Sequence, residues 1–70
     1  MKIQANQNQV IQIAVNGGEI QFISYQGHGK ISIVQNGGNG WNNAGCVSVE
    51  EANQAIDKML AAGGEVVPAS

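Results

Sequence analysis

Two stretches of alternating apolar residues flank an Asn-Gly pair, and this arrangement constrains the fold of the chain more than any other feature. VIQIAV, residues 10–15, and EIQFISY, residues 19–25, each alternate with a period of two, which is typical of strands. Asn16-Gly17 suits a type I′ turn, in which both central residues need positive φ. Whether the loop is Asn16-Gly17 or Gly17-Gly18, odd positions of the first strand lie opposite even positions of the second. The sequence therefore predicts an antiparallel hairpin.

A second turn is predicted at QGHG, residues 26–29, and leads into a third strand. A four-residue loop pairs Tyr25 with Lys30, Ser24 with Ile31 and Phe22 with Ile33. The three strands then form a meander with one apolar face, which needs a cover. That face consists of Ile11, Ile13, Val15, Ile20, Phe22, Ile31 and Ile33.

The cover is predicted to be a helix within residues 48–63. Ser48 and Glu51 have the spacing of a capping box, and Gly63 follows the last apolar position as a C-cap. The apolar stripe has helical spacing and consists of Val49, Ala52, Ala55, Ile56, Met59 and Leu60. The predicted fold class is α+β, with a three- to four-stranded antiparallel meander sheet and one C-terminal helix packed on one face.

The two ends of the chain carry weaker patterns. Residues 1–5 are predicted to form a short edge strand followed by a turn at residues 6–9, although they could instead extend the first strand. Residues 64–70 are predicted to be a loosely ordered tail, although Val66 and Val67 could dock on the core. The predicted domain is therefore residues 1–63.

The few charged side chains limit the classes of partner. The net charge is −2, 11% of residues are charged, and the three cations are Lys2, Lys30 and Lys58. Nucleic-acid binding normally needs a Lys or Arg at each phosphate contact, so the composition argues against it. Because low charge weakens repulsion between copies, a homodimer is expected.

The sequence offers no constellation that points to catalysis, a metal or a cofactor. Cys46 is the single cysteine, so it cannot form an intramolecular disulfide, and with His28 it provides fewer ligands than a zinc site needs. A Cys46–His28 nucleophile pair would lack a third orienting residue. We therefore expect Cys46 to be a small buried residue, His28 to be a solvated turn residue, and the chain not to be an enzyme.

The sequence also predicts where the protein acts. The N-terminal residues lack the apolar run of a signal peptide, and no stretch approaches the roughly 20 apolar residues of a membrane span. The single cysteine fits a reducing compartment. We expect a soluble cytoplasmic protein without a membrane partner.

Trp41 lies in QNGGNGWNNAGC, residues 35–46, which is predicted to be a loop. One interpretation is that the ring folds back and fills an open end between sheet and helix, and this interpretation is favoured. The other is that Trp41 is a partner anchor on a mobile loop, because Trp is enriched among residues that dominate interfaces. The surrounding glycines permit either.

The outer face of the predicted sheet is the second candidate for binding. It alternates Val10, Ala14, Ile23, Tyr25 and Val34 with Gln12, Gln21 and Ser32, and no other segment is left to cover it. It could be an ordinary solvated face, but its neighbouring apolar residues favour a protein interface or a dimer contact. The predicted partner-binding residues are Gln12, Gln21, Ile23, Tyr25, Val34 and Trp41.

The helix carries a further motif. SVEEANQAIDKML provides Ser48, Glu50, Glu51, Ala52, Ala55, Ile56 and Asp57. This pattern after a meander resembles small proteins of phages and mobile elements. In size, charge and layout the chain also resembles the anti-CRISPR and other anti-defence inhibitors among them. The resemblance implies a non-enzymatic inhibitor that binds a host defence complex in the host cytoplasm.

The layout is also similar in outline to the βββα DNA-binding domains of phage integrases and plant AP2 factors. Those families carry Arg and Lys on the sheet strands, whereas this chain offers Gln12, Gln21, Ser32 and Lys30. Because of the similar layout, a small nucleic-acid-associated module is the alternative function.

Overall fold

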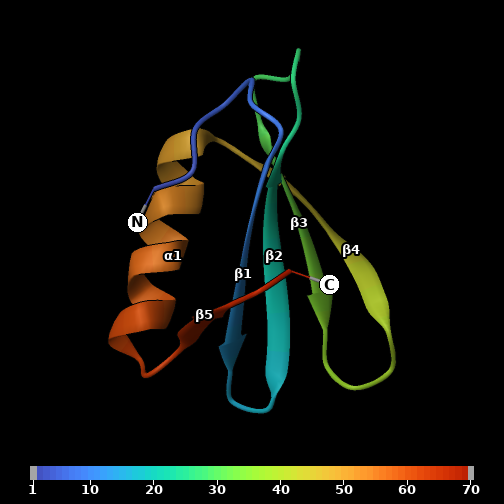
Figure 1. Ribbon diagram of the computed structural model, residues 1–70, viewed down its shortest axis with the longest axis vertical. Helices are drawn as coiled ribbons and strands as arrows, with labels where there is room; N and C mark the ends of the chain where they lie inside the picture. Colours follow the sequence, from blue (N-terminus) through green and yellow to red (C-terminus); the bar gives the residue numbers. More distant parts are fainter. Residues whose placement is uncertain (1, 70) are drawn as a thin grey trace.

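The computed structural model describes residues 2–69 and shows a five-stranded sheet with one helix (Figure 1). The sheet order is β4-β3-β2-β1-β5, and every neighbouring pair is antiparallel. The predicted α+β architecture is confirmed. The elements are β1 (Gln9–Val15), β2 (Gly18–Ser24), β3 (Ile31–Asn36), β4 (Trp41–Val47), α1 (Val49–Ala61) and β5 (Glu65–Val67).

Both predicted hairpins are present in the predicted register. Val15 pairs with Gly18, so the first loop is Asn16-Gly17, with φ of 50° and 79°. These angles are those of a type I′ turn. In the second hairpin, Ser24 pairs with Ile31 and Phe22 with Ile33. The turn chemistry therefore fixes the face on which every side chain of the meander lies.

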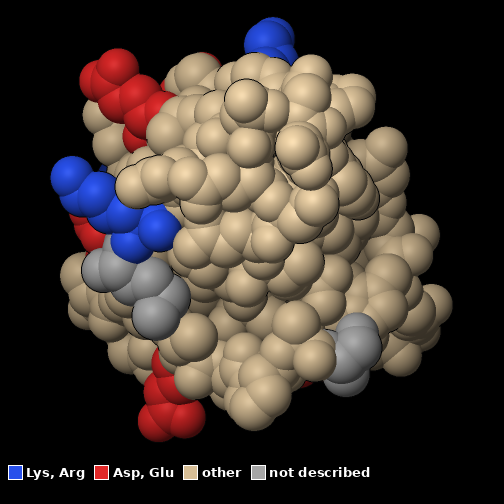
Figure 2. Space-filling view, turned by 45° about the horizontal axis from the view of Figure 1, so that its top comes forward, with Lys and Arg blue, Asp and Glu red and all other residues tan. Residues whose placement is uncertain are grey.

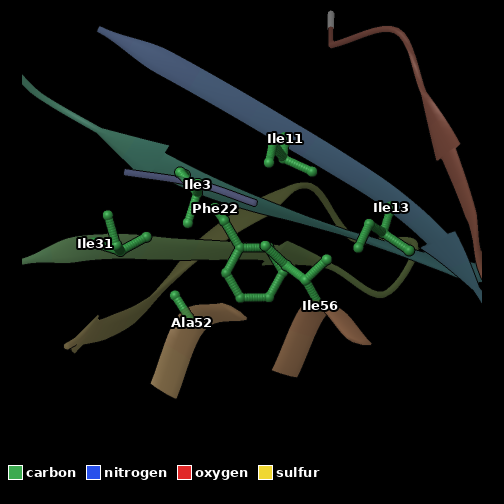
Figure 3. Packing of buried hydrophobic residues seen from close by; sticks show 7 residues of the cluster. All are labelled: Ile3, Ile11, Ile13, Phe22, Ile31, Ala52 and Ile56. Carbon is green, nitrogen blue, oxygen red and sulfur yellow. The ribbon is translucent and has the colours of Figure 1, made fainter. Parts of the chain in front are cut away.

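The core lies between the sheet and α1 (Figure 3). Ala52 and Ile56 of the helix are fully buried against the apolar face of the sheet, as their spacing predicts. The buried apolar residues are Ile3, Ile11, Ile13, Phe22, Ile31, Ala52 and Ile56.

Both ends of α1 have the predicted caps. The Ser48 hydroxyl accepts a hydrogen bond from the Glu51 N–H and donates one to the Glu51 carboxylate, each at 3.1 Å. At the other end, Gly63 has φ of 95°, and the Gly64 N–H donates to the Met59 carbonyl at 2.9 Å. This is a Schellman motif, which needs a residue without a Cβ at the left-handed position.

The N-terminal segment differs from the prediction, because residues 2–8 form no strand. The side chain of Ile3 instead enters the end of the core and is 1% exposed. Asn53 on α1 holds it there: the Ile3 N–H donates to Asn53 Oδ1 at 2.8 Å, and Asn53 Nδ2 donates to the Ile3 carbonyl at 2.9 Å. The Asn53 side chain therefore provides the two main-chain hydrogen bonds that a neighbouring strand would otherwise provide for Ile3. Met1 lies outside the described residues.

The predicted loop at residues 35–46 is also wrong, because its first two residues belong to β3 and its second half belongs to β4. β4 pairs with β3 along the edge of the sheet, with a bulge where the register shifts between Ile33 and Val34. Gly45 at the bulge has φ of 103°, and its N–H donates to Asn43 Oδ1 at 2.8 Å. The bulge interrupts the period of two, so this strand lacks the apolar alternation that identifies the others.

The C-terminal segment is more ordered than predicted. Glu65–Val67 forms β5, which pairs with β1 from Gln12 to Ala14. The Schellman turn after α1 reverses the chain so that it runs beside β1. The prediction of a loose tail is therefore wrong for these three residues, and Ser70 lies outside the described part.

Candidate protein interface on the outer sheet face

We call the face of the sheet opposite α1 the outer face. The strand register places its side chains in three rows that cross β1 to β4 in that order. The first row is Val10, Ile23, Ser32 and Cys46. The second is Gln12, Gln21, Val34 and Asn43, and the third is Ala14, Glu19, Asn36 and Trp41.

Four of these residues form one continuous apolar line, which we call the apolar diagonal: Val10, Ile23, Val34 and Trp41. Val10 and Ile23 are directly opposed, whereas Ile23 and Val34, and then Val34 and Trp41, are diagonal neighbours. Diagonal neighbours on adjacent strands are within reach of large side chains. Val10 and Trp41 at its ends are 44% and 39% exposed. The apolar diagonal therefore crosses four strands and is open to solvent at both ends.

Trp41 does not fill the end of the core, so the favoured sequence interpretation is wrong. It is the first residue of β4 and pairs with Asn36 on the outer face. Ile3 enters the core instead, at the end where Ile31 lies (Figure 3). Trp41 is also not on a loop, since it belongs to a strand that holds its main chain, and its ring is half-exposed.

A chain of hydrogen bonds lies beside the apolar diagonal. Gln21 Nε2 donates to Gln12 Oε1, and Gln12 Nε2 donates to Glu19 Oε2, each at 2.7 Å. These bonds fix the orientation of both amides. Gln12 is only 2% exposed and cannot contact a partner, so the prediction that it is a partner-binding residue is wrong. Gln21 and Glu19 are half-buried and remain at the surface.

Gln12 is buried because the C-terminal segment covers part of the outer face. Val67 of β5 pairs with Gln12, and the chain after β5 passes in front of β1 and β2 in the view of Figure 1. The prediction that nothing covers this face is therefore wrong at its β1 side. The apolar diagonal ends at Trp41 on β4, which is at the opposite edge of the sheet from β5.

Tyr25 lies beyond the apolar diagonal, directly after β2, and is 46% exposed. Its ring meets that of His28 edge to face, with 5.9 Å between ring centroids. The His28 N–H donates to the Tyr25 carbonyl, and the Asn6 N–H donates to the His28 carbonyl, each at 3.1 Å. His28 is thus an exposed turn residue, as predicted, in a turn that the N-terminal segment braces.

Cys46 is exposed on β4, so the prediction that it is buried is wrong. β4 is an edge strand with a bulge, so no further strand lies beside Cys46 to cover its side chain. The Cys46 Sγ lies 3.7 Å from Ser32 Oγ in the same row of the outer face. Within residues 2–69, no cluster of three His, Cys, Asp or Glu side chains could hold a metal ion.

The outer face carries little charge. Glu19 is the one charged residue in the three rows. Figure 2 shows a broad area without charged side chains, and the Lys, Asp and Glu side chains lie near its margins. Without cations in the rows, this face lacks the groups that neutralise phosphates.

Sequence reasoning missed a crevice of about 360 Å³ at the end of the core near the first turn. It lies between α1 and strands whose ends the register brings together, which only the fold reveals. Its lining residues are Val15, Gly18, Glu19, Ile20, Gln35, Asn36, Gly37, Asn42 and Met59.

In comparisons of sequence and structure, no family model, curated protein or solved structure matches the chain. Within residues 2–69, no helix is both long and apolar enough to cross a membrane.

Ile23→Glu tests whether this face is surface or core. We expect the variant to keep its circular dichroism spectrum and to lose about 0.2–1 kcal/mol of unfolding free energy, the contribution of a cross-strand pair. The neighbouring Phe22 is fully buried. Phe22→Glu should therefore abolish the folded spectrum, because it buries an unpaired charge. Unfolding by Ile23→Glu would show that the outer face is part of the core.

Proposed function

We propose that the chain is a non-enzymatic protein-binding module that docks its partner on the outer face. The apolar diagonal is the observation that supports this proposal most. It joins two half-buried aliphatic residues, Ile23 and Val34, to a half-exposed Trp41 whose main chain is fixed in a strand. Tryptophan anchors of this kind dominate the energy of many interfaces.

The surroundings of the apolar diagonal also suit a protein partner. The half-buried Gln21 amide, oriented by its hydrogen bond to Gln12, flanks it, and a partner can bond to the remaining groups of this amide in a polar rim. Few charges would have to be desolvated in a complex, because Glu19 is the one charged residue in the three rows. The same low charge supports self-association, so the proposal includes a homodimer.

As the concrete form of this function, we propose an anti-defence inhibitor of a phage or mobile element that acts in the host cytoplasm. The size, charge and layout of the chain, which resemble those of such inhibitors, support this form. The motif on α1 resembles small proteins of phages and mobile elements. The confirmed capping box accounts for Ser48 and Glu51, and burial accounts for Ala52 and Ile56. The motif therefore builds the scaffold, and the outer face remains for the target.

Capture from bacterial lysate tests the proposal, with identification by mass spectrometry and a nuclease-treated duplicate. We expect one protein complex in stoichiometric amount that survives nuclease and is lost with Ile23→Glu. Val66→Glu is the matched control, because Val66 is 42% exposed but pairs with Ile13, whose side chain faces the core. Loss of the captured material after nuclease treatment would favour the nucleic-acid alternative. Capture of the same protein in equal amount by Ile23→Glu and the wild-type chain would contradict the proposed surface.

The anti-defence form has its own test. Expression of the chain in cells with active CRISPR immunity should restore plaque formation by a targeted phage, and Ile23→Glu should remove this effect. Unchanged immunity across a panel of CRISPR types, together with a captured protein of another kind, would reject the anti-defence form while leaving the binding module intact.

A further inference from the structure

Three Asn-Gly pairs lie in the turns at one end of the molecule. Asn16-Gly17 forms the β1–β2 turn, while Asn36-Gly37 and Asn39-Gly40 lie at the β3–β4 connection, and both turns are at the same end of the sheet (Figure 1). In an Asn-Gly pair, the main-chain nitrogen of Gly can reach the side-chain carbonyl carbon of Asn, since Gly has no side chain in the way. Each pair is therefore a potential site of deamidation.

The reaction needs no partner but water. The Gly nitrogen attacks Asn Cγ, a C–N bond forms, and the Cγ–Nδ2 bond breaks. Ammonia leaves with the proton of the Gly nitrogen, and a five-membered succinimide remains. Water then opens the ring at Cγ to give aspartate with an ordinary main chain, or at the main-chain carbonyl to give isoaspartate. A free Gly N–H and a free Asn side chain favour the first step.

The structure protects two of the pairs through one side chain. Asn36 is half-buried in β3, and its Oδ1 accepts hydrogen bonds from the Gly38 N–H at 2.8 Å and the Gly40 N–H at 3.2 Å. These bonds fix the Asn36 amide. The second bond also directs the Gly40 N–H toward Asn36. The Gly40 nitrogen is then held away from the side-chain carbonyl carbon of Asn39, which it would have to attack.

Asn16-Gly17 has neither form of protection. Both residues are exposed, and the position of a Cβ on Gly17 is open space. In a two-residue turn the N–H of the second central residue points away from the ladder. Within residues 2–69, no main-chain carbonyl accepts from the Gly17 N–H. We propose that Asn16 is a spontaneous modification site of this protein, where deamidation forms aspartate and isoaspartate.

The two products differ in their effect on the fold. An aspartate followed by glycine also suits a type I′ turn, so the aspartate product keeps the hairpin. Isoaspartate adds a main-chain carbon to a loop whose length sets the register of β1 and β2, so it disrupts the turn. Either product adds a carboxylate to a hollow of about 450 Å³ that Glu19 and Glu65 already line.

Peptide mapping of the folded chain after incubation at mildly alkaline pH tests this inference. Deamidation adds about one mass unit. We expect this gain first at Asn16, with both isomers, and later at Asn39 and Asn36. Equal or faster conversion at Asn36 or Asn39 would overturn the proposal. So would an unmodified Asn16 after an unstructured peptide of the same sequence has converted.

A matched pair of variants tests the protection by Asn36. Asn36→Ala removes the acceptor for the Gly40 N–H, so Asn39 should deamidate faster. Asn36→Asp keeps an acceptor oxygen there, so Asn39 should convert at the original rate. Both variants are checked for folding by circular dichroism. Equal Asn39 rates in the two folded variants would contradict the protective role of Asn36.

Discussion

Ile3→Ala should lower the free energy of unfolding by about 2–5 kcal/mol, the usual cost of truncating a buried Ile. Ile3 is 1% exposed and is the member of the buried apolar core that comes from neither the sheet nor α1. A chain of 70 residues buries only a small core, so this loss is a large part of its total stability. Urea unfolding followed by circular dichroism measures it.

Trp41→Ala is the control for this prediction. Trp41 is the larger side chain, but it lies on the outer face and is 39% exposed. Its truncation should cost only about 1 kcal/mol, the scale of a cross-strand contact. A greater loss for Trp41→Ala than for Ile3→Ala would mean that Trp41 contributes more to the core than Ile3.

Asn53→Ala should destabilise the protein by about 1–3 kcal/mol, because it leaves main-chain groups of a buried residue without partners. The Asn53 side chain accepts from the Ile3 N–H and donates to the Ile3 carbonyl, and it also donates to the Val49 carbonyl at 3.1 Å. Gln54→Ala, one residue away on the exposed side of α1, should change stability by less than about 0.5 kcal/mol.

The double variant of Ile3 and Asn53 tests how the two residues act together. If Asn53 stabilises the fold by holding Ile3 in the core, the double variant should lose less stability than the sum of the single variants. Additive losses would show that Asn53 acts independently of Ile3, and wild-type stability in Asn53→Ala would contradict the bracing role altogether.

Local signals in the sequence were sufficient for the meander and the helix. Asn16-Gly17 matches the geometry of one turn type, and Ser48 with Glu51 matches one type of cap. Both signals act between residues close in sequence, so they can be read without the rest of the fold. The alternation of apolar residues then placed Phe22 and Ile31 in the core and Ile23 on the outer face.

The remaining elements depend on contacts between distant residues. β4 forms by pairing with the edge of β3. The bulge at Gly45 interrupts the alternation of apolar residues by which a strand is recognised in the sequence. Ile3 is bound by Asn53, fifty positions later in the chain. The sequence around Ile3 contains no sign of this partner.

The candidate site was predictable in the same uneven way. Ile23 and Val34 could be placed on the outer face from the hairpin register. Trp41 joins them only through the pairing of β4, and Gln12 is removed from the surface only by β5. The apolar diagonal therefore emerges from the assembled sheet, not from any one segment.

The central claim is that the apolar diagonal binds a protein partner and that Trp41 anchors it. The most direct test is capture from lysate with Trp41→Ala beside the wild-type chain, after circular dichroism has shown that the variant is folded. The account predicts that the folded variant loses the protein that the wild-type chain captures through nuclease treatment. Capture of the same protein in the same amount by both chains would contradict it.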